Sequence, residues 1–110
     1  MHELSLTQSV VDICQENAGG RRVLSVTIQI GELSGVVPEA LEFCFEACCR
    51  QTQMEGARLQ IERIGATALC LDCATTFPLA TLFDPCPTCC SCRRQILTGE
   101  EMRVKELEVE

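Results

Sequence analysis

The sequence predicts an α/β (α+β) fold, a small sheet of three strands with two helices, plus an inserted cysteine-rich module. Three observations lead to this prediction. Residues 1–64 alternate between helical and strand periodicity, a strongly alternating segment closes the chain, and two Cys-x-x-Cys pairs lie between these parts. The cysteines are therefore expected to interrupt one α/β domain rather than to follow it.

Length and charge narrow the possible functions. A chain of 110 residues has the size of one ordinary domain. Its net charge of −7 argues against nucleic acid as a partner, because phosphate binding needs a basic face. There are four Phe and no Trp or Tyr, so a platform for stacking bases is not expected. No apolar run is long enough to span a membrane.

The first predicted element is an amphipathic helix over Glu3–Ala18, which Gly19 and Gly20 end. Its expected apolar face follows the three-to-four spacing of a helix and consists of Leu6, Val10, Ile13 and Asn17, with Cys14 beside them. We interpret Cys14 as a small buried core residue rather than a metal or redox group.

A half-buried strand is predicted over residues 22–30, because apolar and polar residues alternate there. Its expected inward positions are Leu24, Val26, Ile28 and Ile30. The loop that follows contains two glycines, but it lacks the spacing and the Lys-Ser/Thr pair of a phosphate-binding loop.

Pro38 suits the first turn of a second helix. The predicted core stripe of this helix is Leu41, Cys44, Phe45 and Cys48, with Cys49 at its edge. Three cysteines this close could suggest a metal cluster. Their place on the apolar stripe favours core packing instead.

Two further strands complete the predicted sheet. Arg58–Ile64 follows the second helix, with Leu59 and Ile61 inward, and a strand–helix–strand crossover makes its two strands parallel with a right-handed connection. In Met102–Val109 the alternation slips by one near Lys105, which predicts a β-bulge or bend.

The order of these elements predicts the domain organisation. The last strand cannot fold alone, so we expect it to join the same sheet. Residues 1–64 and 98–110 would then form one discontinuous α/β domain, with residues 65–97 as an inserted module. A module of this size is too small for an independent apolar core, so metal ligation is expected to hold it together.

The inserted module contains Cys70-Leu-Asp-Cys73 and, twelve residues later, Cys86-Pro-Thr-Cys89. Two such knuckles supply the four thiolates of a closed tetrahedral site, which predicts a zinc-ribbon-like module with structural zinc. An iron–sulfur cluster is the runner-up, because four thiolates do not exclude it. Two disulfides in a secreted module are a third possibility, but the start of the chain lacks the features of a signal peptide, so we expect a cytoplasmic protein with reduced thiols.

The second knuckle is ambiguous, because Cys89 and Cys92 have the same two-residue gap as Cys86 and Cys89. Ribbon knuckles commonly place Gly after the second Cys, where φ is positive, and here that residue is Cys90. A non-Gly residue in this region costs roughly 1–2 kcal/mol. Either the metal enforces this strain, or Cys90 or Cys92 takes part in ligation.

The only histidine of the chain is His2. The Met1 amine, the His2 amide and the His2 imidazole can chelate one ion, and the Glu3 amide can complete a four-nitrogen set. Square-planar nitrogen ligation suits Ni(II) or Cu(II) rather than zinc. The alternative is a solvated or capping histidine without a metal role.

Several segments together match one known family. They are Met-His-Glu-Leu-Ser at residues 1–5, Ile-Gly-Glu-Leu-Ser-Gly-Val at 30–36, the helix around residues 38–45, Glu-Gly-Ala at 55–57, the paired knuckles, and Leu-Glu-Val-Glu at 107–110. With these motifs, which cover nearly the whole length, the chain resembles the HypA/HybF family of hydrogenase nickel-insertion accessory proteins.

The resemblance implies a nickel metallochaperone that is not an enzyme. It implies a transferred Ni(II) at His2 with its neighbours Met1 and Glu3, and a structural Zn(II) on Cys70, Cys73, Cys86 and Cys89. It also implies a nickel-binding GTPase of the HypB type and the large subunit of [NiFe]-hydrogenase as partners, and some relatives serve urease maturation. Cys90 departs from the family's usual Gly.

Two other functions are weighed against this one. A thiol–disulfide enzyme usually places its Cys-x-x-Cys pair at a helix start after a strand, and neither pair has that predicted context. A zinc-ribbon adaptor without a nickel role is the stronger alternative, although the negative charge opposes binding to nucleic acid. We expect no membrane partner and a monomer or weak homodimer.

Overall fold

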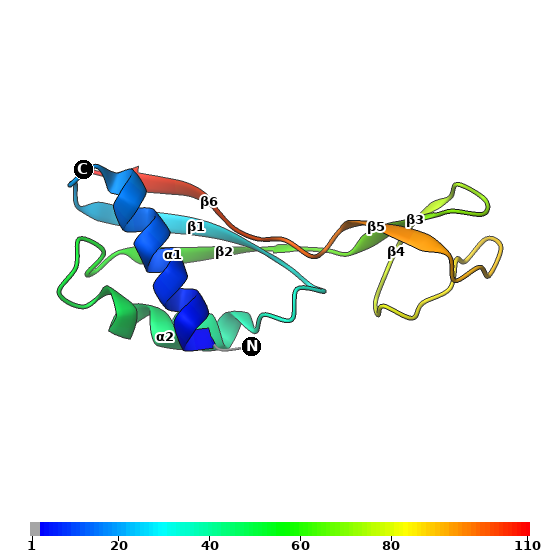
Figure 1. Ribbon diagram of the computed structural model, residues 1–110, viewed down its shortest axis with the longest axis horizontal. Coiled ribbons are helices and arrows are strands. Elements are labelled where there is room, and N and C mark those ends of the chain that lie inside the picture. The colour runs from blue at the N-terminus through cyan, green and yellow to red at the C-terminus, as the bar shows by residue number, and fades with distance from the viewer. Residues whose placement is uncertain (1–2) are drawn as a thin grey trace.

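The computed structural model describes residues 3–110. The molecule is elongated, with extents of 54 × 23 × 16 Å, and its two small sheets lie at opposite ends of the long axis (Figure 1). The larger part contains α1 (Glu3–Ala18), β1 (Val23–Gly31), α2 (Pro38–Cys49), β2 (Arg58–Ile64) and β6 (Met102–Val109). The smaller part contains β3 (Thr67–Cys70), β4 (Thr76–Pro78) and β5 (Arg94–Thr98).

The main sheet has the strand order β2-β1-β6. β1 pairs with β2 in parallel across the α2 crossover, and β6 pairs antiparallel with β1. Both relations confirm the sequence prediction, including the return of the last strand to the same sheet. Both helices lie on one side of this sheet (Figure 1). Within residues 3–110, neither helix is long and apolar enough to cross a lipid bilayer.

Each strand of the antiparallel pair contains one extra residue. In β6 the pairing moves from Thr27↔Glu106 to Ile28↔Val104, which leaves Lys105 unpaired and confirms the predicted bulge. In β1 the register shifts between Val23 and Ser25, which was not predicted. This second shift turns Leu24 outward, to 38% exposure, so its inward assignment was wrong and Val23 takes the buried position.

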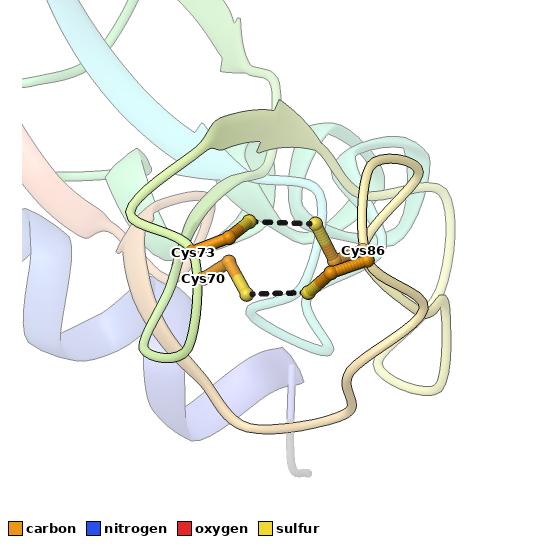
Figure 2. Close-up of side chains that lie close together, drawn as sticks. Cys70, Cys73 and Cys86 are labelled. Atoms are coloured by element: carbon orange, nitrogen blue, oxygen red, sulfur yellow. Dashed lines mark hydrogen bonds between the residues drawn. The ribbon is translucent and has the colours of Figure 1, made fainter.

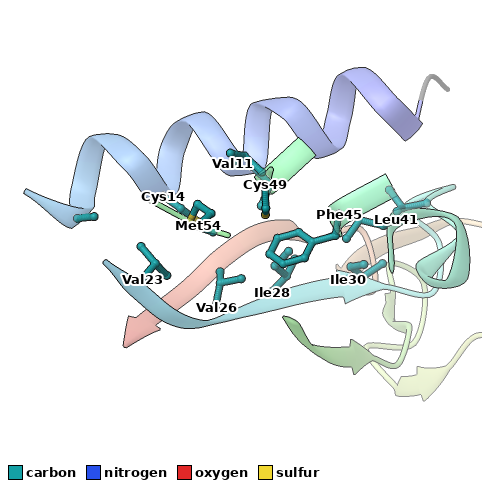
Figure 3. Packing of buried hydrophobic residues seen from close by; sticks show 13 residues of the cluster. Val11, Cys14, Val23, Val26, Ile28, Ile30, Leu41, Phe45, Cys49 and Met54 are labelled. Atoms are coloured by element: carbon teal, nitrogen blue, oxygen red, sulfur yellow. The ribbon is translucent and has the colours of Figure 1, made fainter. Parts of the chain in front are cut away.

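The main core lies between the helices and β1. Figure 3 shows Val26, Ile28 and Ile30 of β1 on the side of the sheet that faces the helices. The buried residues of α1 are Thr7, Val10, Val11, Cys14 and Ala18. The prediction that Ile13 and Asn17 face the core was wrong, since Ile13 is 45% exposed and Asn17 is exposed. The helix is rotated because it packs on α2 as well as on the sheet.

The buried face of α2 is also rotated by about one position. Leu41, Phe45 and Cys49 are buried, at a spacing of four residues, while Cys44 and Cys48 are only half-buried. Cys49 was expected at the edge of the stripe and instead lies in the core, where α2 meets α1 (Figure 3). The expectation of core packing therefore fits Cys49 best, Cys48 packs against the edge of the core, and Cys44 is only half-buried.

The smaller part has its own sheet, with strand order β4-β3-β5 and antiparallel pairing throughout. The sequence did not predict this sheet. It surrounds a small apolar cluster that consists of Ala66, Ala68, Cys70, Phe77, Leu79 and Cys86. Leu33, from the loop between β1 and α2, packs against the same cluster. The module thus has a few apolar contacts in addition to its cysteines.

The junction of the two parts requires a glycine at position 31. The Gly31 amide donates to the Glu101 carbonyl at 2.7 Å, and the Leu33 amide donates to the Gly99 carbonyl at 2.7 Å. A Cβ at Gly31 would lie 2.1 Å from both the carbonyl carbon and oxygen of Gly99. These are backbone atoms of the segment that leads from β5 into β6, so they cannot move aside cheaply.

Gly31→Ala is therefore expected to destabilise the protein by about 3 kcal/mol or more, as severe overpacking does. The measurement is the midpoint of urea unfolding. Gly65→Ala is the matched control, because no atom lies within 4 Å of a Cβ at that position, and its effect should stay within about 1 kcal/mol. Equal midpoints for the two variants would contradict the close approach at Gly31.

Candidate metal centre

The two knuckles of the smaller part have the same backbone turn. The Ala74 amide donates to the Cys70 carbonyl at 2.9 Å, and the Cys90 amide donates to the Cys86 carbonyl at 2.8 Å. Ala74 and Cys90 both have a φ of 63°. The left-handed conformation expected at Cys90 is thus confirmed, and the first knuckle needs it as well.

Cys90→Gly is expected to raise the free energy of unfolding of the zinc-loaded protein by up to about 1.5 kcal/mol. Relief of left-handed strain gives roughly 1–2 kcal/mol, and the greater freedom of Gly in the unfolded chain takes back about 0.5–1 kcal/mol. Thermal unfolding of the zinc-loaded protein measures the change. Ala80→Gly in the same module, where φ is not positive, should lower stability instead. Loss of stability in both variants would show that Cys90 is not strained.

The four knuckle sulfurs converge on one point. The sulfur atoms of Cys70, Cys73, Cys86 and Cys89 all lie within 4.8 Å of one another. The Cys70 and Cys89 sulfurs are 3.5 Å apart, and the Cys73 and Cys86 sulfurs are 3.6 Å apart. Figure 2 shows Cys70 and Cys73 of the first knuckle facing Cys86 of the second. A tetrahedron with zinc–sulfur bonds of about 2.3 Å has edges of about 3.8 Å. The spacing fits a single tetrahedral ion and leaves no room for a cluster of several irons.

Burial divides the four cysteines into two pairs. Cys70 and Cys86 are buried in the small apolar cluster, whereas Cys73 and Cys89 are exposed. Each knuckle contributes one cysteine of each kind. A bound ion would therefore lie between the apolar cluster and solvent, held from both sides.

The surroundings of the two exposed sulfurs shift the pKa values of Cys73 and Cys89 in opposite directions. The hydroxyl and amide of Thr75 lower the pKa of Cys73 to about 6, with the hydroxyl oxygen 3.1 Å from the sulfur. At Cys89 the Ser91 amide acts in the same direction, but the neighbouring sulfurs and partial desolvation raise the pKa to about 12. Four thiols this close cannot all lose their protons unless a cation compensates the charge. Thr75 was missed by the sequence analysis, although a hydroxyl residue two positions after a knuckle cysteine was visible.

Comparison with known proteins agrees with this arrangement. A family model described as hydrogenase/urease nickel incorporation, metallochaperone, hypA matches residues 1–109. The chain belongs to the HypA family. It is 62% identical over 110 residues to the hydrogenase maturation factor HypA of Geotalea uraniireducens, with full coverage of both chains.

Two solved HypA structures share the fold. The Ni metallochaperone HypA from Helicobacter pylori aligns with a TM-score of 0.70 at 29% identity, over 99% of this chain and 97% of that one. A second HypA solution structure aligns with a TM-score of 0.73 at 30% identity, over 100% of this chain and 97% of that one. The HypA family consists of nickel-incorporation metallochaperones rather than enzymes.

The predicted nickel ligands Met1 and His2 lie outside the described residues, as does the side chain of Glu3. The backbone of Glu3 begins α1. The HypA resemblance of the first five residues therefore stays a sequence observation.

The remaining cysteines of the described residues are not members of the four-sulfur group. Burial raises the pKa of Cys14 to about 11 and that of Cys49 to about 12, so both stay protonated thiols at neutral pH. This agrees with the core role predicted for Cys14. Cys92, the alternative partner in the second knuckle, is exposed and is not part of the sulfur group, which contains Cys89.

Proposed function

We propose that this chain binds Ni(II) at its N-terminus and helps to insert it into the large subunit of [NiFe]-hydrogenase. The observation that carries the proposal is the match to the HypA family over residues 1–109, which includes the starting Met-His-Glu triplet. In this proposal Met1, His2 and Glu3 supply the nickel ligands. A nitrogen-rich set of this kind suits Ni(II).

We further propose that Zn(II) binds to Cys70, Cys73, Cys86 and Cys89 and has a structural role. The convergence of four sulfurs within 4.8 Å supports this assignment, since a closed set of four thiolates leaves no open position for catalysis. Residues 65–97 are then the zinc-binding module, and residues 1–64 and 98–110 are the nickel-binding domain. Two separate sheets and two apolar clusters support this division.

The proposed partners follow from family membership. Hydrogenase maturation requires contact with other maturation proteins, and we propose a HypB-type nickel-binding GTPase and the hydrogenase large subunit for this role. Urease maturation proteins are a further partner class, in line with the family description. We place the protein in the cytoplasm, where its thiols stay reduced, as a monomer or weak homodimer.

The test is a nickel titration of the untagged protein with zinc measured in parallel. The proposal expects one zinc per chain that does not exchange for nickel, and one nickel that a chelator removes without loss of zinc. One zinc and no specific nickel would instead support a zinc-ribbon adaptor. Metal-free protein with a reversible disulfide would contradict both.

A further inference from the structure

A small group of polar side chains joins the two knuckles. Asp72 lies inside the first knuckle, while Ser91 and Arg93 follow the second. The Ser91 hydroxyl donates to one carboxylate oxygen of Asp72, and the Arg93 guanidinium donates to the other at 2.5 Å. The Arg93 amide donates to the Ser91 hydroxyl oxygen at 3.1 Å. None of these contacts involves a sulfur atom.

Ser91 also contacts both cysteines of the second knuckle through its backbone. Its carbonyl oxygen accepts the Cys86 amide at 2.9 Å, and its amide donates to the Cys89 sulfur. The residue whose hydroxyl meets Asp72 is therefore the residue that orients Cys86 and Cys89. Removal of the Ser91 hydroxyl should therefore alter the positions of both the Cys86 and the Cys89 sulfur.

A backbone hydrogen bond runs beside this contact. The Leu71 amide, between Cys70 and Asp72, donates to the Arg93 carbonyl at 3.0 Å. The first knuckle is thus joined to the segment after the second knuckle by one side-chain contact and one main-chain contact. Both contacts fix the distance between the two knuckles. Without them, only the bound ion would set this distance.

We propose that the Asp72–Ser91 contact positions the second knuckle against the first, so that the four thiols are already close before the metal binds. This inference rests on the proposed zinc ligation. The Arg93 side chain is 71% exposed, so its ion pair with Asp72 contributes little, and the hydroxyl–carboxylate contact has the main role. Asp72 and Ser91 are positioning residues, since neither coordinates the ion.

Loss of the Asp72 charge alone would change the zinc release rate in the direction opposite to loss of a positioning contact. When Zn²⁺ leaves at neutral pH the thiolates take up protons, so the site passes from a net charge of about −2 to nearly zero, and loss of a nearby carboxylate charge should disfavour release. Loss of a positioning contact should release it faster. Asp72→Asn separates the two effects, because it removes the charge and keeps an oxygen that can accept the Ser91 hydroxyl.

The first measurement is the rate at which the zinc-loaded full chain loses zinc to a chromophoric chelator. Asp72→Ala and Ser91→Ala are each expected to release zinc about 10-fold faster, as is typical when a partner that orients a ligand is lost. The double variant should be only slightly faster than either single variant, because both single variants already remove the Asp72–Ser91 contact. Asp72→Asn should release zinc no faster than wild type, because it loses the charge and keeps the contact.

Asp84→Ala is the matched control. Asp84 is an acidic residue of the same module, and its carboxylate accepts hydrogen bonds from the Ala80 and Thr81 amides and the Thr81 hydroxyl. These contacts stay within its own loop. Its zinc release rate should therefore match wild type.

The second measurement is amide hydrogen exchange in zinc-free protein. The Leu71 and Cys86 amides should be protected in wild type, and less protected in Asp72→Ala and Ser91→Ala. Exchange at the rate of an unstructured chain in zinc-free wild type would overturn the proposal. Unchanged or slower zinc release in both alanine variants, or release from Asp72→Asn as fast as from Asp72→Ala, would overturn it as well. A chain that binds no zinc contradicts the ligation proposal, and the exchange rates then decide the positioning role alone.

Discussion

His2→Ala is expected to abolish specific nickel binding while zinc content and fold stay unchanged. His2 provides the only imidazole of the chain, so no other histidine can replace it. The four knuckle cysteines belong to the smaller part, which lies away from α1 along the long axis (Figure 1), so we expect their zinc to be retained. A site at a chain end can also release its ion to a partner, because few packed contacts oppose opening.

The same site predicts a dependence on the free amine and on pH. An uncleaved N-terminal extension should weaken nickel binding, whereas a C-terminal tag without histidines should not. Ligation by an amine, by deprotonated amides and by a neutral imidazole releases protons, so nickel affinity should fall as pH is lowered. Glu3→Ala keeps the backbone amide at position 3 and serves as the matched control, with nickel binding retained.

Calorimetric nickel titrations of wild type, His2→Ala and the N-terminally extended protein provide the measurement, each with zinc content recorded. Equal nickel affinity in all three would rule out an N-terminal site. The function would then be that of a zinc-ribbon adaptor or of a nickel carrier that uses cysteines.

The main sheet could be predicted from the sequence because its strands carry strong local signals. The alternation of β1 and β6 gave their positions, and the slip near Lys105 gave the bulge that the pairing shows. The shift at Leu24 had no such signal, because Val23 and Leu24 are both apolar and either could face inward. Only the pairing with β6 decides between them.

The helix faces were less predictable, because they depend on two packing partners. The apolar residues of α1 are compatible with a buried face that contains Ile13 or with one that contains Val11. Contact with α2 buries the face that contains Val11. In α2, packing against α1 likewise buries Cys49 instead of the predicted Cys48. Periodicity indicates that a helix is amphipathic, but the neighbouring elements decide which of its neighbouring stripes is buried.

The cysteine module shows a different limit. The ligand spacing predicted convergence of the four sulfurs, yet β3, β4 and β5 have only four, three and five residues and lack a recognisable period. The Asp72–Ser91 contact joins residues 19 positions apart, and no local pattern marks it. Such contacts follow from the shape that the knuckles impose, so they become visible only once the module is folded.

Cys73→Ala and Cys86→Ala are both expected to lose zinc, because three ligands cannot close the tetrahedral site. The loss is large, since structural zinc contributes about 10–16 kcal/mol of apparent binding free energy. The small apolar cluster and the contacts between the knuckles replace only a small part of this free energy, so β3, β4 and β5 should lose most, though not all, of their protection from hydrogen exchange. β6 should be weakened as well, because it follows directly from this module through residues 99–101.

The two variants separate ligation from packing. Cys73 is exposed, so its truncation removes a ligand and almost no buried contact, whereas Cys86 is 0% exposed and packs in the apolar cluster. Cys73→Ala should therefore lose zinc and most of the β3–β5 protection without a packing defect, and Cys86→Ala should be at least as unstable. Cys92→Ala, which removes an exposed thiol outside the sulfur group, should keep one zinc per chain. Zinc content and thermal unfolding of the three variants test the four-cysteine ligand set. A full zinc complement with native stability in Cys73→Ala or Cys86→Ala would show that this ligand set is wrong.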